Sequence, residues 1–379
     1  MEKKVRVVYL LTSPMSANVF GVQQIRALYE HGFAVYLICG SGHLNSELLE
    51  YTTSVHINSF LKRGSSPISD AISIIKLLFS ILKIKPTIVI YSTPKAALFG
   101  AVVSYVIQIP IRIYQVWGIR WQNLSGLKLW VVRSADFLAI YFSTKVTVVS
   151  RSVLEFLSLN SKFNKLIVLG SGSTAGVDTR IFHPNQSVKM PSQGLKIGYA
   201  GRVSNDKGIS DLCGLFARLS AQIPDLYLEV IGDLDLEDKI SEKLVTELRS
   251  NPRIQWISSL TQPDLAERMR NWDLQIFLSK REGLGNVILE AGACGVPTFC
   301  WDMVGTKDAI PDFAQDFLIS YGEMKLLEKS VIKYLNSPLE QVKQLKLAQW
   351  YGDNFEQKKV LSEFVGFIDA NLKAYYDSK

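Results

Sequence analysis

Short apolar runs recur along the chain and alternate with stretches whose apolar residues have helical spacing. Each run is flanked by turn-forming residues, which is typical of short buried strands. Alternation of strand and helix patterns predicts open α/β sheets that bind ligands at the carboxyl ends of their strands. The expected strands are Lys4–Leu11, Ala34–Cys39, Thr87–Tyr91, Ile111–Gln115, Lys145–Val149, Lys196–Ala200, Leu226–Ile231, Ile254–Ile257 and Leu274–Leu278.

The length and composition of the chain are sufficient for two such sheets, each in its own domain. A chain of 379 residues is too long for one compact domain, and its 47% hydrophobic and 20% charged residues can supply two globular cores. The most apolar stretch, Ala96–Ile109, lies between Pro94 and Pro110 and falls short of the roughly 20 residues that span a bilayer. We therefore expect it to be a buried helix.

The cysteines and the N-terminus indicate a cytoplasmic protein. Residues Met1–Lys4 lead straight into a strand pattern, so we expect no signal peptide. The four cysteines show neither metal-ligand spacing nor a paired framework, which is typical of reduced core residues. They are Cys39, Cys213, Cys294 and Cys300.

The segment Lys280–Pro297, KREGLGNVILEAGACGVP, follows a strand pattern and contains a turn and a helix. Gln275–Leu278 predicts the strand and Glu282–Gly285 the turn. The helix is expected to begin near Asn286 and to end at Gly295, just before a proline. The N–H groups of such a helix start, together with glycines that allow close approach, form a phosphate-binding site.

Two glutamates lie in the same segment as this predicted phosphate-binding site. Glu282 lies on the predicted turn, and Glu290 lies within the first two helical turns behind it. Carboxylates do not attract phosphate, but they suit the hydroxyls of a sugar and of a ribose. The segment therefore predicts a sugar-nucleotide site. Isolated surface glutamates are usually only solvated, so this interpretation depends on the whole strand–turn–helix pattern and on basic partners upstream.

The basic partners lie on a second loop of the same kind. Leu195–Ala200 reads as a strand, Gly201–Gly208 (GRVSNDKG) as a loop, and Ile209–Ser220 as a helix. Arg202 and Lys207 both lie on the loop. A planar Arg fork and a Lys point charge suit a diphosphate, and they would stabilise its growing negative charge as it leaves. The spacing is not that of a Walker loop.

Charge is shared unevenly between the two halves. Residues 1–185 hold 19 Lys and Arg against 8 Asp and Glu, whereas the remainder holds 23 against 27. A basic first domain suggests an anionic partner: a phosphate-bearing acceptor, an anionic membrane surface, or nucleic acid. Lys62, Arg63 and the basic amphipathic stretch Ile68–Lys85 favour a lipid surface, although such a helix also fits ordinary packing on a sheet.

The two donor-side loops resemble those of glycosyltransferase family 4. The resemblance is carried by Gly198–Gly208 and Arg281–Pro297, and it runs from about Val5 to Ile310. The first half is similar to the bacterial capsule and exopolysaccharide branch of that family. This second similarity rests on Ser66–Asp70, Lys85–Lys95, Val168–Asp178 and the following Phe182-His-Pro184.

The resemblance implies the GT-B fold, in which two Rossmann-like domains face each other across a cleft. It implies an acceptor-binding domain over residues 1–185 and a donor-binding domain over residues 186–354. A C-terminal helix, residues 355–379, would cross back onto the first domain. The implied activity is a retaining transfer of a hexosyl or N-acetylhexosaminyl group from a nucleotide-sugar, with a UDP-sugar expected. The implied acceptor is a polyprenyl-diphosphate-linked sugar or a polysaccharide in surface polysaccharide synthesis.

By matching position, the resemblance also assigns site residues. Arg202 and Lys207 would hold the donor diphosphate, Glu282 would contact the transferred sugar, and Glu290 would bind the ribose hydroxyls. No metal and no other cofactor is implied, and no nucleic acid is an expected partner. The expected location is the cytoplasmic face of the inner membrane, bound peripherally. Further donor contacts are expected from Gly21, Gly201, Gly283, Leu284, Gly285, Asn286 and Val287.

The first domain departs from the family pattern. Many members carry His-Gly at a sugar-contacting position where this chain has Trp117-Gly118, and none of the four histidines replaces it by position. The acceptor-side candidates are Lys95, Arg120 and Trp121. A lysine after a proline at a strand end suits an acceptor phosphate, and a tryptophan face can stack on a sugar. A solvated lysine and a packed tryptophan are the alternatives.

Rival functions have weaker signals. Gly170–Ala175 matches G-x-G-x-x-A, but neither a helix nor an acidic residue follows as a dinucleotide site requires. Asp233-Leu-Asp235 resembles a metal-binding Asp-x-Asp, yet it lies on a turn. Neither the acid/base groups of an epimerase nor the lysine pocket of a phosphorylase is evident. A non-catalytic sugar-nucleotide-binding protein, prompted by Trp117, remains the alternative to an enzyme.

Overall fold

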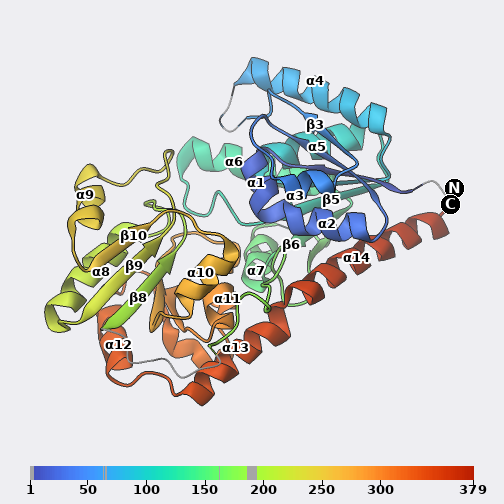
Figure 1. Ribbon diagram of the computed structural model, residues 1–379. Helices are drawn as coiled ribbons and strands as arrows, with labels where there is room; N and C mark the ends of the chain where they lie inside the picture. Colours follow the sequence, from blue (N-terminus) through green and yellow to red (C-terminus); the bar gives the residue numbers. More distant parts are fainter. Residues whose placement is uncertain (1–3, 63, 65, 162, 186–193) are drawn as a thin grey trace. The chain divides into compact units, whose positions relative to one another are not determined.

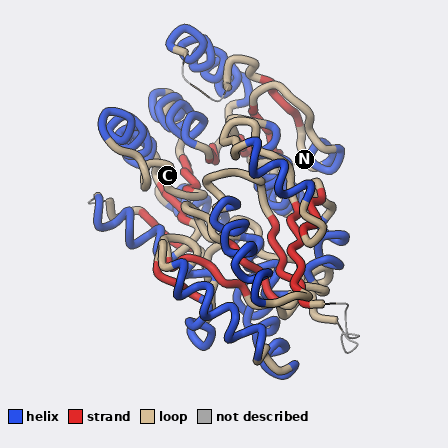
Figure 2. The backbone as a smooth tube through the Cα atoms, turned by 90° about the vertical axis from the view of Figure 1, so that its left-hand side faces the viewer, coloured by secondary structure: helices blue, strands red, loops and turns tan. Residues whose placement is uncertain are grey.

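The computed structural model describes residues 4–62, 64, 66–161, 163–185 and 194–379. The chain divides into two compact units. Unit 1 comprises residues 1–175 and 358–379, and unit 2 comprises residues 176–357. Figure 2 shows the strands of these units lying between helices. None of the helices in the described ranges is long and apolar enough to cross a bilayer.

Unit 1 is built on a seven-stranded parallel sheet with the order β3-β2-β1-β4-β5-β6-β7. Consecutive parallel strands are joined by helices, which cover the two faces of the sheet. The strands in chain order are β1 (Arg6–Leu10), β2 (Ala34–Cys39), β3 (Ser54–Ile57), β4 (Ile88–Ser92), β5 (Ile111–Val116), β6 (Lys145–Val148) and β7 (Leu166–Val168).

The helices of unit 1 include one turn of π-helix directly after β1 and the early helix α1. They are α1 (Pro14–Ser16), η1 (Ala17–Gly21), α2 (Val22–Glu30), α3 (Ser46–Glu50), α4 (Pro67–Ile84), α5 (Pro94–Val106), α6 (Gly126–Phe142), α7 (Arg151–Asn160) and α14 (Gln357–Asp377). The buried residues of α5 confirm a packed helix in the apolar stretch 96–109, and this helix ends at Val106. Of the basic pair at 62 and 63, Arg63 lies outside the described residues.

The C-terminal helix α14 contributes to the core of unit 1. Phe364, Ile368 and Leu372 belong to the buried cluster that contains residues of β1, β2 and α2. In Figure 1, α14 (red) lies beside α2 (blue) at the other end of the sequence. The apolar spacing of α14 therefore serves a core built mainly from residues far away in the chain.

Unit 2 is built on a six-stranded parallel sheet with the order β10-β9-β8-β11-β12-β13. Its strands are β8 (Leu195–Ala200), β9 (Leu226–Ile231), β10 (Ile254–Ile257), β11 (Leu274–Phe277), β12 (Thr298–Asp302) and β13 (Leu318–Ser320). Its helices are α8 (Ile209–Gln222), α9 (Glu242–Ser250), α10 (Gln262–Met269), α11 (Asn286–Ala293), η2 (Lys307–Ala309), η3 (Asp312–Phe317), α12 (Met324–Asn336) and α13 (Gln341–Phe355).

The division between the units falls at 175/176, whereas the sequence placed it at 185/186. Contacts of the intervening segment explain the difference. Val177 pairs with Glu356 in an isolated bridge, and its N–H donates to the carbonyl of Phe355 at 2.8 Å. The Arg270 guanidinium donates to the carbonyl of Ile181 at 3.0 Å. All these partners belong to unit 2, so the segment packs with the second sheet.

Candidate active site

The strand order of unit 2 brings the two predicted donor loops together. The chain runs outward from β8 through β9 to β10 and then returns to β11 on the other side of β8. This reversal is a topological switch point, the position at which open α/β sheets commonly bind a ligand. The loop with Arg202 and Lys207 follows β8, and the loop with Glu282 follows β11. Sheet topology therefore makes residues 75 positions apart neighbours.

Backbone contacts fasten these two loops to each other. The Lys280 N–H donates to the carbonyl of Asp206 at 2.8 Å. Gly208, in the left-handed region with φ +72°, lies so close to β11 that an added Cβ would stand 2.1 Å from the Leu278 carbonyl oxygen. A side chain is excluded at this position both by φ and by space. These contacts hold the two loops together.

An ion pair joins two of the catalytic candidates, one on each loop. The Lys207 ammonium donates to the Glu282 carboxylate, and both side chains are largely buried, with 15% and 13% of their surfaces exposed. The ring of Phe277 lies 5.8 Å from the Lys207 Nζ. An ammonium has three donors, so the bond to Glu282 leaves two that can meet phosphate oxygens. The pair holds a cation and a carboxylate side by side at the switch point.

Arg202 is held by an acidic turn that sequence reasoning took only as a weak metal motif. Its guanidinium pairs with the Asp235 carboxylate. Burial tends to raise the pKa of Asp235, but hydrogen bonds from the amides of Glu237 and Asp238, with Arg202, outweigh it and leave that pKa lowered. Asp235 is therefore a carboxylate that orients Arg202, and half of the Arg202 side chain stays exposed.

Two further cations on the β11 loop are paired in the same manner. Arg281 lies 3.4 Å from a carboxylate oxygen of Asp206, and Lys280 lies 3.5 Å from one of Asp211. The acids compensate the basic side chains while no anion is bound. A diphosphate at this edge of the sheet would meet cations whose positions are already fixed, which lowers the cost of organising them.

Helix α11 begins as the sequence predicted, directly behind the turn. Its N-cap is Gly285, with φ +79°, and its first residue is Asn286. The left-handed conformation turns the chain sharply from the loop into the helix, and glycine adopts it without strain. Gly283 and Leu284 are buried in the turn, while Val287 in the first helical turn is partly exposed. The helix start therefore presents its early N–H groups at the switch point.

Glu290 lies one turn further along α11 and is only partly exposed. Burial of its carboxyl raises the pKa to about 8. The side chain is therefore largely neutral at pH 7 while the site is empty. A ligand that donates two hydroxyls to this carboxyl would favour the ionised form, because a carboxylate only accepts hydrogen bonds.

Gly305 supports the Glu282 turn, and sequence reasoning did not identify it. An added Cβ there would stand 2.6 Å from the carbonyl oxygen of Glu282. The neighbouring Thr306 is buried and donates to the Trp301 carbonyl at 2.6 Å, which fixes the turn after β12. The missing signal was β12 itself: recognising Thr298–Asp302 as a strand would have placed Gly305 at a strand's carboxyl end.

The comparisons with known proteins agree with this geometry. Residues 184–349 match the family model described as glycosyl transferases group 1. The chain is 30% identical over 321 residues to the capsular polysaccharide biosynthesis glycosyltransferase CapM of Staphylococcus aureus, covering 83% of each chain. The chain belongs to the group 1 glycosyltransferases.

Solved structures give the same fold for this glycosyltransferase. Sucrose-phosphate synthase of Thermosynechococcus elongatus matches with a TM-score of 0.77 at 14% identity, over 98% of this chain and all of the other. HepE of Anabaena, in complex with UDP, matches with a TM-score of 0.74 at 17% identity, over 97% of this chain and all of that one. The two Rossmann-like parallel-sheet domains therefore have the GT-B fold.

Unit 1 of the glycosyltransferase has a switch point of its own, between β1 and β4. The Thr12 and Thr93 hydroxyls lie 2.7 Å apart there, and the Thr12 N–H donates to Thr93 Oγ1 at 3.1 Å. Thr93 has φ +66°, a strained conformation for a β-branched residue. Such strain is often stored at functional sites, which makes this edge of unit 1 a candidate site.

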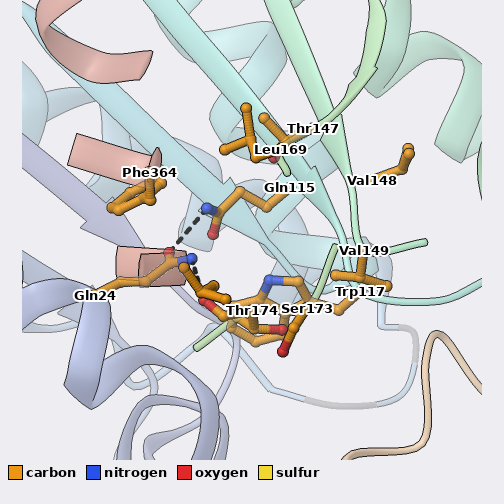
Figure 3. A pocket seen from close by; sticks show the side chains of 11 residues that line it. Gln24, Gln115, Trp117, Thr147, Val148, Val149, Leu169, Ser173, Thr174 and Phe364 are labelled. Atoms are coloured by element: carbon orange, nitrogen blue, oxygen red, sulfur yellow. Dashed lines mark hydrogen bonds between the residues drawn. The ribbon is translucent and has the colours of Figure 1, made fainter. Parts of the chain in front are cut away.

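A cavity of about 20 Å³ lies beside the carboxyl ends of β5 and β6 in unit 1 (Figure 3). Trp117 lines it, and within the described part of the chain its buried indole N–H has no hydrogen-bond partner. Two other residues that line it are hydrogen-bonded: Gln115 donates to Gln24 at 2.8 Å, and Gln24 donates to the Thr174 carbonyl at 2.7 Å. The Tyr9 hydroxyl completes this buried polar network. Trp117 thus shares this cavity with the hydrogen-bonded pair Gln24 and Gln115.

The acceptor-side candidates have different surroundings. Lys95 donates to Asp70 at 2.7 Å and is largely buried, so its charge is balanced within unit 1. Arg120 is exposed. Burial raises the pKa of the nearby Asp136 to about 6, although the positive charge of Arg120 tends to lower it. Trp121 is buried.

The surroundings of Trp121 correct one expectation. Its ring centroid lies 5.2 Å from that of Phe156 and 6.0 Å from that of Phe137, and the Arg133 guanidinium lies over its ring. Its faces therefore pack inside the domain, and the structure does not offer them to a sugar. The packed alternative holds for this residue.

Gly21 also has a packing role. It ends the π-helical turn, and an added Cβ would lie 3.1 Å from a methyl of Leu11. Gly201 directly follows β8 in unit 2, where its N–H donates to the Ile231 carbonyl at 2.9 Å. Gly201 therefore lies at the carboxyl end of a central strand, whereas Gly21 lies at the junction of the π-helical turn and α2. Gly201 adjoins Arg202, whereas Gly21 belongs to the other sheet.

Proposed function

We propose that this glycosyltransferase moves a hexosyl or N-acetylhexosaminyl group from a nucleotide-sugar, with UDP-sugar as the donor, to a polyprenyl-diphosphate-linked or polysaccharide acceptor in surface polysaccharide synthesis. The observation that carries the donor side is the convergence of Lys207, Glu282 and Arg202 at the switch point of unit 2. The similarity to CapM over 83% of both chains supports a capsule-type acceptor. A structure of HepE with UDP-glucose supports a UDP-sugar donor.

The proposed reaction retains the anomeric configuration and uses no metal. The acceptor hydroxyl attacks the anomeric carbon on the face from which the diphosphate leaves. The bond between that carbon and the phosphate oxygen breaks, the new glycosidic bond forms, and the acceptor proton passes to the leaving phosphate. Lys207 and Arg202 would stabilise the negative charge that develops on the diphosphate. Glu282 would orient the sugar, and Glu290 the ribose.

The basic character of residues 1–185 supports an anionic acceptor. A polyprenyl diphosphate carries such a charge and lies at a membrane surface. We accordingly propose that the protein works at the cytoplasmic face of the inner membrane and binds there peripherally. A second candidate function is non-catalytic binding of a sugar nucleotide, favoured by Trp117 where many family members have a histidine. Turnover distinguishes the two.

A thermal-shift panel with UDP, GDP, ADP, CMP and NAD at equal concentration tests the donor assignment. A nucleotide at about 100 times its dissociation constant stabilises the fold by roughly 2.7 kcal/mol. We expect a selective shift with UDP, followed by transfer from a UDP-sugar in an assay with a lipid-diphosphate acceptor. A shift with NAD alone, or with none of the five, would refute the donor site. Binding of UDP without any transfer would favour the non-catalytic candidate.

A further inference from the structure

Helix α6 of unit 1 exposes an apolar stripe along one face. The exposed fractions are 78% for Leu127, 68% for Trp130 and 63% for Tyr141, and Val131 and Leu138 are also exposed. At 100° per residue these five side chains fall within an arc of roughly 100° over four turns. The opposite face, with Asp136, Ala139 and Ile140, is buried. A helix on the surface of a soluble domain normally turns a polar face outward. An exposed apolar stripe of this kind is therefore typical of a surface that contacts a partner or a membrane.

Helix α4 of the same unit also exposes apolar side chains. Helix α4 packs on α5, and α5 packs on α6, so the three form one helical layer (Figure 1). On α4, Ile75, Phe79 and Leu82 are exposed along one face. Lys76 and Lys83 are exposed beside them on the same helix. The basic amphipathic sequence of α4 already suggests a lipid surface, whereas the stripe on α6 is apparent only in the structure.

Charges on this layer have one sign. The acidic residues within α4, α5 and α6 are Asp70 and Asp136. Asp70 is bonded to Lys95, and Asp136 is buried and accepts from the Tyr114 hydroxyl at 3.2 Å. The exposed charges are therefore those of lysines, including Lys128 within the stripe's first turn. An apolar surface bordered by uncompensated cations complements an anionic lipid headgroup layer over hydrocarbon.

We propose that the α6 stripe, residues 127, 130, 131, 138 and 141, inserts into a bilayer that carries anionic headgroups, with the lysines of α4 and α6 at the headgroup level. A second copy of the chain is a poorer occupant, because two such faces would bring cations together. Tryptophan and tyrosine suit the boundary between water and lipid, since each has an apolar body and a polar tip.

This inference deepens the proposed function and rests on it for the acceptor. Helix α6 follows directly from the segment after β5 that holds Trp117 and Arg120. Insertion of the stripe would therefore bring one loop of the candidate acceptor side to the membrane, where a lipid-linked sugar lies. The orientation would be set by unit 1 alone, since the stripe, the lysines and the β5 loop all belong to it.

Trp130 provides the direct test, because it is the one exposed tryptophan among the seven, all of which the structure describes. Vesicles of phosphatidylglycerol and phosphatidylcholine should shift its emission to the blue, and brominated acyl chains should quench it. Pure phosphatidylcholine should give a much weaker response. Trp130→Phe should remove the shift. An unchanged emission spectrum of the wild-type protein with anionic vesicles would overturn the proposal.

Vesicle flotation tests the stripe as a binding element. Leu127→Gln with Val131→Gln should lower partitioning to anionic vesicles at least tenfold, since each buried aliphatic side chain is worth about that factor. The matched control is Val342→Gln with Leu345→Gln, two exposed apolar residues on α13 of unit 2, which should leave partitioning unchanged. Equal flotation of both double variants would refute the proposal. So would a wild-type dimer in light scattering that the stripe variant dissociates.

The shift of melting temperature with UDP, measured on the same proteins without vesicles, separates this inference from the proposed function. A stripe variant that keeps the UDP shift and circular dichroism of the wild type is folded and has an intact donor site. Loss of flotation in that variant then reports on the membrane face alone. Flotation of a wild-type protein that binds no UDP would refute the donor assignment and leave the membrane face standing.

Discussion

At the scale of single residues, the candidate donor site contains cations that already have carboxylate partners. Lys207 pairs with Glu282 and Arg202 with Asp235. The first pair is largely buried, and removing one member of such a pair leaves an uncompensated charge. The two members should therefore fail in different ways when each is replaced.

We expect Lys207→Ala to abolish transfer and to weaken UDP binding, because it removes a diphosphate contact. Glu282→Gln should lower the transfer rate about 100-fold or more while UDP still binds, since an amide can accept from Lys207 but carries no charge toward the sugar. Arg218→Ala, which breaks an exposed ion pair with Glu328 elsewhere on unit 2, is the control and should change neither. Initial rates and calorimetric UDP affinities provide the measurements. Wild-type transfer by Lys207→Ala would refute the assignment.

Glu290 predicts a pH dependence of nucleotide binding. Burial raises its pKa from the ordinary value of 4.5 to about 8, so the empty site holds a proton there at pH 7. If the carboxylate accepts the ribose hydroxyls, binding releases that proton. UDP affinity should then rise between pH 7 and pH 8, by at most about tenfold per pH unit, and level off above the pKa. Glu290→Gln should bind UDP independently of pH in this window. A wild-type affinity that falls with rising pH would contradict the role of Glu290.

The same shift has a consequence for stability with a definite sign. The folded protein retains a proton on Glu290 that the unfolded chain releases above about pH 4.5. The contribution of this group is therefore fully present below pH 4.5 and is lost as the pH rises through about 8. Without ligand, the melting temperature of Glu290→Gln should consequently fall less than that of the wild type between pH 6 and pH 9. Differential scanning calorimetry without nucleotide measures this, and parallel curves would show that Glu290 titrates normally.

At the scale of elements, the close approach of the β8 loop to β11 depends on one glycine. Gly208 caps α8 with φ +72°, and a methyl group there would collide with the Leu278 carbonyl. Elsewhere on the same helix, Gly214 has space around it and helical geometry. The two positions form a matched pair that separates tertiary contact from helix propensity.

Gly208→Ala should destabilise the protein by about 1–3 kcal/mol or more and weaken UDP binding, because the Lys207 loop must move away from β11. Gly214→Ala should instead stabilise it by about 0.5–1 kcal/mol, since alanine is the better helix former. Urea denaturation and UDP titration measure both effects. A Gly208→Ala variant as stable as the wild type would show that the contact with Leu278 is not required.

The strands show where sequence patterns were sufficient to predict secondary structure. The nine predicted strands all occur, and the predicted boundaries of β2, β9 and β10 agree with the structure. The strands that were missed are β3, β7, β12 and β13. Strands β3, β7 and β13 are short edge strands of their sheets, in which little periodicity can develop. Strand β12 contains only three consecutive apolar residues, Phe299 to Trp301, and so short a run does not by itself indicate a strand.

At the scale of the whole molecule, unit 1 is assembled from two distant segments of the chain. Residues 358–379 complete a core whose other members lie within the first 175 residues. Ile368 is fully buried in that core, whereas Lys373 on the same helix is exposed. The C-terminal helix thus serves the stability of the N-terminal sheet.

We expect Ile368→Ala to lower the free energy of unfolding by about 2–5 kcal/mol, the usual cost of deleting a large buried aliphatic group. Lys373→Ala should change it by less than about 0.5 kcal/mol. Intrinsic fluorescence during urea denaturation can follow both variants, with UDP affinity as a separate readout for unit 2. If Ile368→Ala were as stable as Lys373→Ala, α14 would contribute little to the core of unit 1.

The sequence by itself determined the α/β class, the two strand–loop–helix segments and most strands, because strand period, turn glycines and helix signals are local. It also proposes Arg202, Lys207, Glu282 and Glu290 as site residues. Only the tertiary structure decided that Asp235 orients Arg202, that Gly305 supports the Glu282 turn, that Trp121 is packed, and that α6 exposes an apolar stripe. These properties depend on which strands are adjacent and on which helix face remains uncovered, and neither is encoded in the spacing of residues along one segment.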